Sequence, residues 1–508
     1  MVRETTLTAT LIDCLIDRFN RQGIVYCHWK SNMELAKATA GQLDLDLLVE
    51  RKSLLPAQTT LAQLGFKAAV ARWGANPPGI HHYYGLDAET QQLIHLHLFS
   101  SVLTGESFVK SHLFPFEAML LENVYAVGGM RVTSKPAELV LFTLRMFIKY
   151  GSLFDLAVLW RKSASAKKEV RWLQGEADPA ANRATALSLL GKYCPVIDEQ
   201  LFVRCVETLD SDRSLLTRMM LAQQVRRRLK VYAKHSAFHR LVAYGQLLWS
   251  EVQRRWGTKR QNKALQAGGA VIAFVGADAT GKSTLVAETG RWLGDTFAVN
   301  VIHTGKPPSS WLTAPVNLAL ALTRRLVATQ RIDQFKSQKS VSGDSSLARH
   351  NFRGFSSLLY ALRAVALAWD RRRLILTNRR RAAAGELIVC DRYPSNVTGA
   401  MDSPCLVEEP RKTGGLVGLY NRLVRLEQRL YKQIPPPDIV LRLKVSIETA
   451  RKRNRERNGQ DKEAYLEARH RQSQDWQLPG VKAIYAIDTE QTLAATTRAV
   501  KEAIWESL

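Results

Sequence analysis

The apolar positions in the second half of the chain form short, compact runs separated by helical patterns. The runs cover residues 270–275, 300–304, 386–390 and 439–445. The segment 285–293 carries apolar residues at the spacing of one helix face. Strands that alternate with helices in this way predict a parallel sheet covered by helices on both faces. We therefore expect an α/β fold here.

The first half shows short strands and helices in alternation up to about residue 135, and helices alone after that. Strand patterns lie at residues 24–27, 43–49, 67–72 and 93–98. Helical spacing begins at 137–150, and 261–269 is a polar linker that ends in glycine. These changes predict an α+β domain at 1–135, a helical basic region at 136–262 and a third domain at 268–508.

Composition is that of a globular protein, with a large charge to explain. The chain has 508 residues and a net charge of +26, and its length favours roughly two to four domains. The first residues lack the apolar stretch of a signal peptide, and no run approaches the roughly 20 apolar residues that span a bilayer. The 6 cysteines are scattered without a CxxC pair, which favours free thiols in a reducing compartment. We expect a cytoplasmic protein.

Basic residues are dense between residues 213 and 263, which include Arg226-Arg227-Arg228. Three interpretations stay open: a helical bundle with a solvated basic side, a contact with an anionic membrane surface, and a contact with nucleic acid. No recognisable nucleic-acid motif supports the last one. A membrane contact would make the protein peripheral to the inner face of the membrane.

A glycine-rich loop follows the 270–275 run and precedes a helix. Gly276, Gly281, Lys282 and Ser283 match the pattern G-x-x-x-x-G-K-[ST]. Its glycines let backbone N–H groups turn toward phosphate oxygens, and the next helix directs its positive end at the same anion. Lys282 is expected to bridge the β- and γ-phosphates, and the Ser283 hydroxyl to hold Mg²⁺. The loop therefore predicts ATP and Mg²⁺ as cofactors.

Several later features accompany this loop in a fixed order. They are Asp278 inside the loop, Thr284 directly after it, Asp370-Arg371 on a helical segment, Asp391-Arg392-Tyr393 at a strand end, and Asp438 before the last run. Together with the loop, this set resembles thymidylate kinases over about residues 268–490. The resemblance implies a P-loop kinase fold and transfer of a phosphoryl group to a nucleoside monophosphate.

The resemblance also implies roles for individual residues. Asp391 would lie near Mg²⁺, Arg392 would hold the acceptor's phosphate, and Asp278 would contact an acceptor hydroxyl. An arginine-rich lid would supply cations to the transferring group, and its members would be Arg451, Arg453, Arg455 and Arg457. Arg451 and Arg455 share one helix face, and guanidinium groups bind phosphates bidentately.

The segments that would contact the acceptor differ from the family. Residues 303–307 read His-Thr-Gly-Lys-Pro where thymidylate kinases carry an acidic-Arg-Pro element, and Ala279 stands where they usually have glycine. Residues 311–353 and 394–409 are also unlike the family. The identity of the acceptor is therefore left open, whereas phosphoryl transfer from ATP is expected.

Asp44 and Asp46 lie two residues apart on the 43–49 strand, so both face the same side. Such a pair can share a divalent metal, as in nucleotidyltransferases. The segments HWKSN, GQLDLDLLVERKS and LIHLHLFSS, within roughly residues 20–150, resemble a group of uncharacterised bacterial nucleotidyltransferase-fold proteins. The resemblance implies a metal site at the two carboxylates.

This match departs from an active transferase at two places. Lys30-Ser31 stands in place of a Gly-Ser element, and His95 and His97 occupy the strand where a third carboxylate would lie. The histidines either complete a metal site or lie at the edge of the core, and His28 is a further candidate. An active domain and a degenerate domain that binds a nucleotide or phosphosugar both stay open.

Three functional hypotheses follow. The first is a Mg²⁺/ATP-dependent kinase that acts on a nucleotide or another phosphate-bearing small molecule. The second is an accessory kinase of cell-surface polysaccharide synthesis, with a sugar or lipid-linked acceptor. The third is a switch protein that hydrolyses ATP without an acceptor. The oligomeric state is left open.

Overall fold

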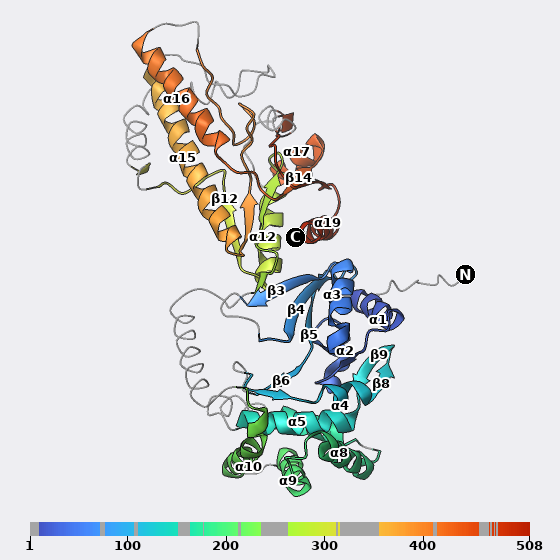
Figure 1. Ribbon diagram of the computed structural model, residues 1–508. Coiled ribbons are helices and arrows are strands. Elements are labelled where there is room, and N and C mark those ends of the chain that lie inside the picture. The colour runs from blue at the N-terminus through green and yellow to red at the C-terminus, as the bar shows by residue number, and fades with distance from the viewer. Residues whose placement is uncertain are drawn as a thin grey trace, which may run out of the picture. The chain divides into compact units, whose positions relative to one another are not determined.

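The structure is a computed structural model. It describes residues 10–71, 77–105, 110–150, 163–175, 177–211, 215–234, 263–310, 313–314, 355–409, 414–456, 467, 470–471, 473 and 476–508. The chain forms two compact units, Met1–Gln261 and Asn262–Leu508, and each is described by itself (Figure 1). The division into three sequence domains stays a prediction, and the helices of the middle segment belong to the first unit.

The first unit contains a mixed sheet. Its strands are β1 (Tyr26–His28), β2 (Leu45–Val49), β3 (Lys67–Ala71), β4 (Ile80–Leu86), β5 (Leu93–Phe99), β8 (Val124–Val127) and β9 (Met130–Thr133). They are ordered β3-β4-β5-β2-β1-β9-β8, and the pairs β5-β2 and β1-β9 are parallel. Strands β6 (Val102–Thr104) and β7 (His112–Phe114) form a separate antiparallel pair. The strands predicted before residue 135 are present with ends shifted by one or two residues.

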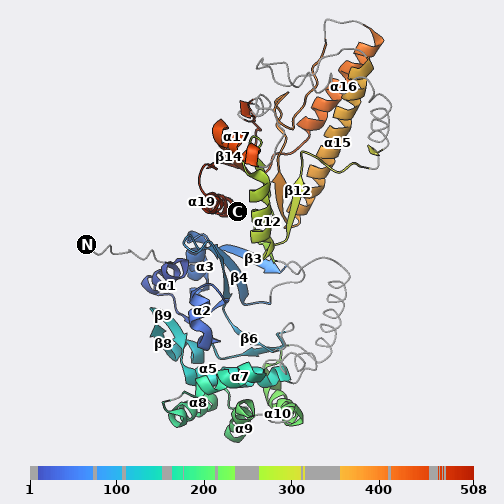
Figure 2. The same ribbon diagram turned by 180° about the vertical axis from the view of Figure 1, so that it is seen from behind.

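Helices cover both faces of this sheet. They are α1 (Leu11–Arg21), α2 (Leu35–Thr39), α3 (Leu54–Gln63), α4 (Glu117–Glu122), α5 (Lys135–Tyr150), α7 (Ser163–Gln174), α8 (Pro179–Tyr193), α9 (Glu199–Asp210) and α10 (Leu215–Arg228), with 3₁₀ turns η1 (Asn32–Glu34), η2 (Arg51–Ser53) and η3 (Leu229–Tyr232). Helix α1 begins at a capping box between Thr10 and Asp13. Figure 2 shows α7 to α10 gathered around α5.

Alternation along β2 divides its side chains between two cores. Leu45, Leu47 and Val49 enter a core shared with α1 and α3. Leu48 points to the opposite face and joins a core that includes Trp29 and the apolar side chains of α5 and α7 to α10. Asp46 follows the same alternation as Leu48, so it lies on the face covered by the helices of the middle segment.

The second unit is built on a sheet in which every paired strand is parallel to its neighbour. Its strands are β11 (Val271–Val275), β12 (Val299–His303), β13 (Leu387–Asp391), β14 (Ile439–Lys444) and β15 (Ala483–Asp488), ordered β12-β13-β11-β14-β15; β10 (Lys263–Leu265) precedes them. The predicted parallel α/β sheet is confirmed. Strand β15 was not predicted, because half of its side chains are exposed and its apolar run is short.

Helices α12 (Lys282–Gly294), α15 (Phe355–Ala383), α16 (Gly415–Lys432), α17 (Ile447–Glu456) and α19 (Leu493–Ser507) accompany this sheet. Helices α15 and α16 run side by side in both views (Figure 1 and Figure 2). Their apolar side chains, among them Ile375 and Tyr431, pack on Val271, Ala273 and other alternate residues of the central strands. Among the described residues, no helix combines the length and the apolar content needed to cross a membrane.

Candidate functional site

The glycine-rich loop joins β11 to α12 in the backbone conformation that its glycines allow. Gly276 has φ 153° and Gly281 has φ 86°. A Cβ at Gly276 would lie 2.7 Å from the carbonyl oxygen of Leu443, so a larger residue does not fit there. Ala279 also has a positive φ, 63°, which costs a residue with a Cβ about 1–2 kcal/mol. The loop thus keeps its shape although alanine replaces the usual glycine.

Lys282 folds its side chain back into this loop. Its Nζ donates to the carbonyl oxygen of Gly276 at 3.0 Å and to that of Ala277, and the residue is only 6% exposed. Burial, followed by the neighbouring charge of Arg392, lowers the pKa of Lys282 to about 8. The ammonium group therefore lies inside the loop, and its contact with a phosphate stays a prediction.

Ser283 and Asp391 come together from separate elements at this edge of the sheet. The Ser283 hydroxyl, in the first turn of α12, donates to Asp391 Oδ2 at 3.1 Å. Asp391 ends β13, which pairs directly with β11. Within the described part of the chain, the other carboxylate oxygen, Oδ1, is buried and has no hydrogen-bond partner. A hydroxyl beside a carboxylate oxygen of this kind fits the hard oxygen ligands that Mg²⁺ prefers.

Arg392 is fixed by two carboxylates. Its Nη2 donates to Asp278 Oδ1 at 2.8 Å, and its Nη1 donates to Asp402 Oδ2 at 3.2 Å. Burial acts to lower the pKa of Arg392, but the two carboxylates outweigh it and raise the pKa. The residue has φ 72°, and a Cβ on Gly305 would lie 2.7 Å from Arg392 Cδ. The backbone around Arg392 is therefore specialised to place its guanidinium beside the loop.

Asp370 and Arg371 lie behind this site. Arg371 is 2% exposed, and its guanidinium donates to the carbonyl oxygens of Thr304 at 2.8 Å and Asp402 at 2.6 Å. Asp370 accepts from the backbone N–H of Ser310 at 3.0 Å. Both side chains are satisfied by the protein itself, so they hold the segments that carry the site.

The predicted lid arginines divide into three groups. Arg451 is paired with Glu467, and Arg453 donates to the carbonyl oxygen of Thr489 at 2.6 Å. Arg455 is exposed on α17, and Arg457 lies outside the described residues. Contacts of Arg451 and Arg455 with a transferring phosphoryl group stay a prediction.

Sequence reasoning missed several residues around the loop. Asp402 accepts a hydrogen bond from Arg392, and no sequence pattern in the segment 394–409 had indicated this contact. Trp476 donates from Nε1 to the carbonyl oxygen of Tyr393 at 2.9 Å and borders a small cavity beside Gly276 and Arg392. The pKa of His470 is lowered by burial and then by the charge of Lys282, which shows that this ring lies near the loop.

Thr284 is exposed beside Ser283, and its contact with the nucleotide stays a prediction. Asp438 directly precedes β14, so it lies at the amino ends of the strands and not at the carboxyl ends that carry the loop. There it accepts from the backbone N–H of Val271 at 2.9 Å and pairs with Arg379. Asp438 therefore makes contacts that hold the sheet together, although the sequence had grouped it with the residues of the loop.

The first unit carries a second polar cluster around Asp44 and Asp46. His95 Nδ1 lies 2.8 Å from Asp44 Oδ1, and His97 Nδ1 lies 3.0 Å from Asp46 Oδ1. Lys30 Nζ also contacts Asp46 Oδ1 at 3.0 Å. Burial acts to raise the pKa of Asp46, but the charge of Lys30 and the contact with His97 outweigh it and hold that pKa well below its usual range.

His28 lies apart from this cluster in its hydrogen bonding. Its Nδ1 is 2.5 Å from Asn32 Oδ1, and Asn32 donates to the Glu138 carboxylate at 2.7 Å. Burial lowers the pKa of His28 and raises that of Glu138 to about 7. His28 is therefore part of a buried hydrogen-bond chain that ties β1 to α5.

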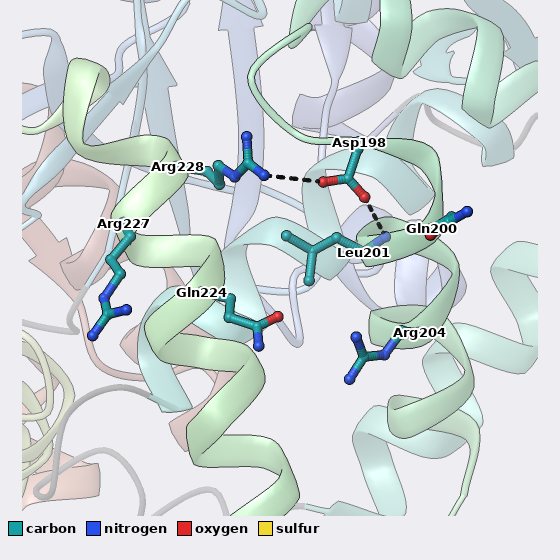
Figure 3. Close-up of a pocket in the computed structure, with 7 residues that line it drawn as sticks. All are labelled: Asp198, Gln200, Leu201, Arg204, Gln224, Arg227 and Arg228. Carbon is teal, nitrogen blue, oxygen red and sulfur yellow. Dashed lines mark hydrogen bonds and ion pairs between the residues drawn. The ribbon is translucent and has the colours of Figure 1, made fainter.

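Helix α9 and the basic helix α10 line a hollow of about 290 Å³ (Figure 3). Arg204, Arg227 and Arg228 contribute to it, and Arg228 Nη2 lies 3.6 Å from Asp198 Oδ2. Residues 235–262 of the basic segment lie outside the described residues. Contact of residues 213–263 with a membrane surface or with nucleic acid stays a prediction.

Comparisons with known proteins give one kind of match. No family model and no curated protein matches the chain. A solved structure of deoxyadenosine kinase from M. mycoides with bound dATP is 16% identical, covers 46% of this chain and 98% of its own, and gives a TM-score of 0.26. The structure of that kinase with the products dCMP and a flexible dCDP is 15% identical and covers 47% and 100%, with a TM-score of 0.27.

Proposed function

We propose that the second unit transfers the γ-phosphoryl group of ATP to a phosphate-bearing small molecule, in the manner of nucleoside monophosphate kinases. The observation that carries the proposal is that two positively charged side chains are held in place at the ends of adjacent strands. Lys282 is held by the loop after β11, and Arg392 is held by two carboxylates after β13.

The donor side of the proposal rests on the loop. Its backbone turns at Gly276 and Gly281, and α12 starts directly afterwards, so N–H groups and a positive helix end are available to phosphate oxygens. Ser283 and Asp391 would hold Mg²⁺, which neutralises charge on the β- and γ-phosphates. Lys282 would stabilise the charge that develops during transfer.

The acceptor side rests on Arg392. A guanidinium that is clamped by Asp278 and Asp402 is oriented before any substrate arrives, and its planar fork suits the oxygens of a phosphate. Transfer to water alone requires no such second anion site. Arg392 therefore favours an acceptor that carries its own phosphate over an ATP-hydrolysing switch.

The test uses the full chain with γ-³²P-labelled ATP, Mg²⁺ and a panel of nucleoside monophosphates and sugar phosphates. We expect label to move to at least one acceptor, and Lys282→Ala to reduce the rate by about 10³-fold or more. Lys432→Ala, which removes an exposed lysine at the end of α16, is the matched control and should leave the rate unchanged. Label that appears only as inorganic phosphate, whichever acceptor is added, would instead support the switch protein.

A further inference from the structure

One face of the first unit's sheet carries a row of histidine and aspartate side chains. His82 on β4 is the register partner of His97 on β5, and His97 is the register partner of Asp46 on β2. His95 and Asp44 lie two residues before His97 and Asp46, so the alternation of each strand brings them to the same face. Three strands thus place three imidazoles and two carboxylates together.

The three imidazoles are close enough to bind one ion. One ring nitrogen from each of His82, His95 and His97 lies within 4.8 Å of the other two. His82 Nδ1 and His95 Nε2 are 3.2 Å apart. Two nitrogens bound to one tetrahedral zinc ion at 2.0–2.1 Å lie roughly 3.3 Å from each other. This pair is therefore already at the separation of two ligands.

The carboxylates fix which nitrogen each ring directs toward its neighbours. Asp44 contacts His95 at Nδ1 and Asp46 contacts His97 at Nδ1, which leaves Nε2 of both rings on the side of the cluster. Within the described part of the chain, His97 Nε2 is buried and has no hydrogen-bond partner. Metal-binding histidines commonly use their second ring nitrogen in this way, on a carboxylate that sets the orientation and basicity of the ring.

Charge and access also suit a cation. The carboxylates of Asp44 and Asp46 offset the ammonium group of Lys30, which contacts Asp46 at 3.0 Å, and the charge of Lys110, which also acts on Asp46. The side chains of His95 and His97 are 19% and 16% exposed, so the cluster is held by its neighbours but still reachable from solvent. A purely structural histidine cluster explains the ring contacts, but it leaves His97 Nε2, which lies 3.8 Å from Asp44 Oδ2, without a hydrogen bond among the described residues.

We propose that His82, His95 and His97 bind one transition-metal dication of the zinc class through their ring nitrogens. Asp44 and Asp46 act as positioning residues that orient the rings, in place of the direct metal contact that the sequence predicted for them. Three protein ligands leave a fourth position for water or an anionic ligand, as in zinc sites that act on substrates. This proposal is independent of phosphoryl transfer by the second unit.

The test measures metal binding by the untagged full chain after chelator treatment. Zn²⁺ is titrated against a chromophoric chelator, and Co²⁺ is added separately to record its visible spectrum. We expect one tight equivalent of Zn²⁺, a tetrahedral Co²⁺ spectrum and a higher melting temperature with Zn²⁺. His97→Ala and His82→Ala should each weaken binding at least about 100-fold, and Asp46→Asn about 10- to 100-fold.

His81→Ala is the matched control, because His81 neighbours His82 on β4 but points to the opposite face. Its affinity for Zn²⁺ should equal that of the unaltered chain. Circular dichroism identifies any variant that has not folded, and the Co²⁺ spectrum of the unaltered chain needs no variant at all. Absence of a tight equivalent of Zn²⁺, or equal affinity in His81→Ala and folded His82→Ala, would overturn the proposal.

Discussion

Arg392 donates a hydrogen bond from Nη2 to Asp278 Oδ1 at 2.8 Å, and so joins the end of β13 to the phosphate-binding loop. The two residues are far apart in the sequence, and both were singled out there for different contacts with an acceptor. Their direct ion pair means that the charge of Arg392, on the proposed acceptor side, is coupled to the loop that forms the proposed donor side.

Replacement of Arg392 by lysine tests the acceptor side. An ammonium group keeps the charge but cannot contact Asp278, Asp402 and a phosphate with a planar fork. We expect phosphoryl transfer to fall by about 10²-fold, or roughly 3 kcal/mol of transition-state stabilisation, with the Kd for ATP within about threefold. Steady-state transfer assays and calorimetric ATP titrations measure the two quantities.

The matched control is Arg379→Lys, which alters an ion pair with Asp438 at the amino ends of the strands of the same sheet. It should leave the transfer rate unchanged. If Arg392→Lys transfers phosphate as fast as the unaltered chain, Arg392 has no role in acceptor binding.

The buried lysine predicts how nucleotide binding depends on pH. The pKa of Lys282 is lowered to about 8, so the ammonium form predominates at pH 7 and is lost as the pH rises through 8. A phosphate binds the charged form, and the Kd for ATP should therefore increase about tenfold between pH 7 and pH 9. Lys282→Arg keeps its charge in this range, so its Kd, although larger, should not change with pH. An equal pH dependence in both proteins would assign the effect to another group.

Asp438 is predicted to serve stability and not catalysis. It accepts from the Val271 backbone N–H and pairs with Arg379 and Lys482, and it is 7% exposed. Asp438→Ala leaves a buried donor unsatisfied and should lower the free energy of unfolding by about 2–3 kcal/mol. The Kd for ATP of the folded variant should be unchanged. Asp295→Ala, at an exposed position after α12, should change neither quantity.

Glu138 predicts a pH dependence of stability in the first unit. Burial raises its pKa to about 7 from an ordinary 4.5, so folding favours the protonated carboxyl. This stabilisation is complete below pH 4.5 and is lost as the pH rises through 7, a change of about 3 kcal/mol. Urea titrations at pH 5 and pH 7.5 should show the loss in the unaltered chain.

Glu138→Gln cannot ionise, so the difference between the two pH values should shrink by most of that amount. Glu207→Gln, at an exposed position on α9, is the control and should retain the full difference. A Glu138→Gln protein with the same pH dependence as the unaltered chain would mean that another group titrates.

The parts of the structure that short sequence patterns specify were predicted well. The glycine-rich loop and the β11-to-α12 connection follow from local backbone requirements, and the parallel sheet follows from the alternation of strands and helices. Arg392 was found because it directly follows an apolar strand. Its partner Asp402 was not, because it is placed by a turn with φ 61° that no local pattern indicated.

Contacts that depend on strand register were harder to predict. Asp44, Asp46, His95 and His97 were found from alternation within their own strands. His82 was missed because β4 was not predicted, and only the antiparallel register of β4 and β5 brings His82 beside His97. Asp438 shows the converse, since a motif position was found but its role is set by Val271 and Arg379 across the sheet.

The most direct test of phosphoryl transfer by the second unit is a single-turnover experiment with excess protein, γ-³²P-labelled ATP and an acceptor identified in the panel. It records how the label divides between the acceptor and inorganic phosphate. We predict that most of the label reaches the acceptor, and that Lys282→Ala slows transfer by about 10³-fold or more while Lys432→Ala leaves it unchanged. Label that moves only to water, or transfer that survives unchanged in Lys282→Ala, would contradict it.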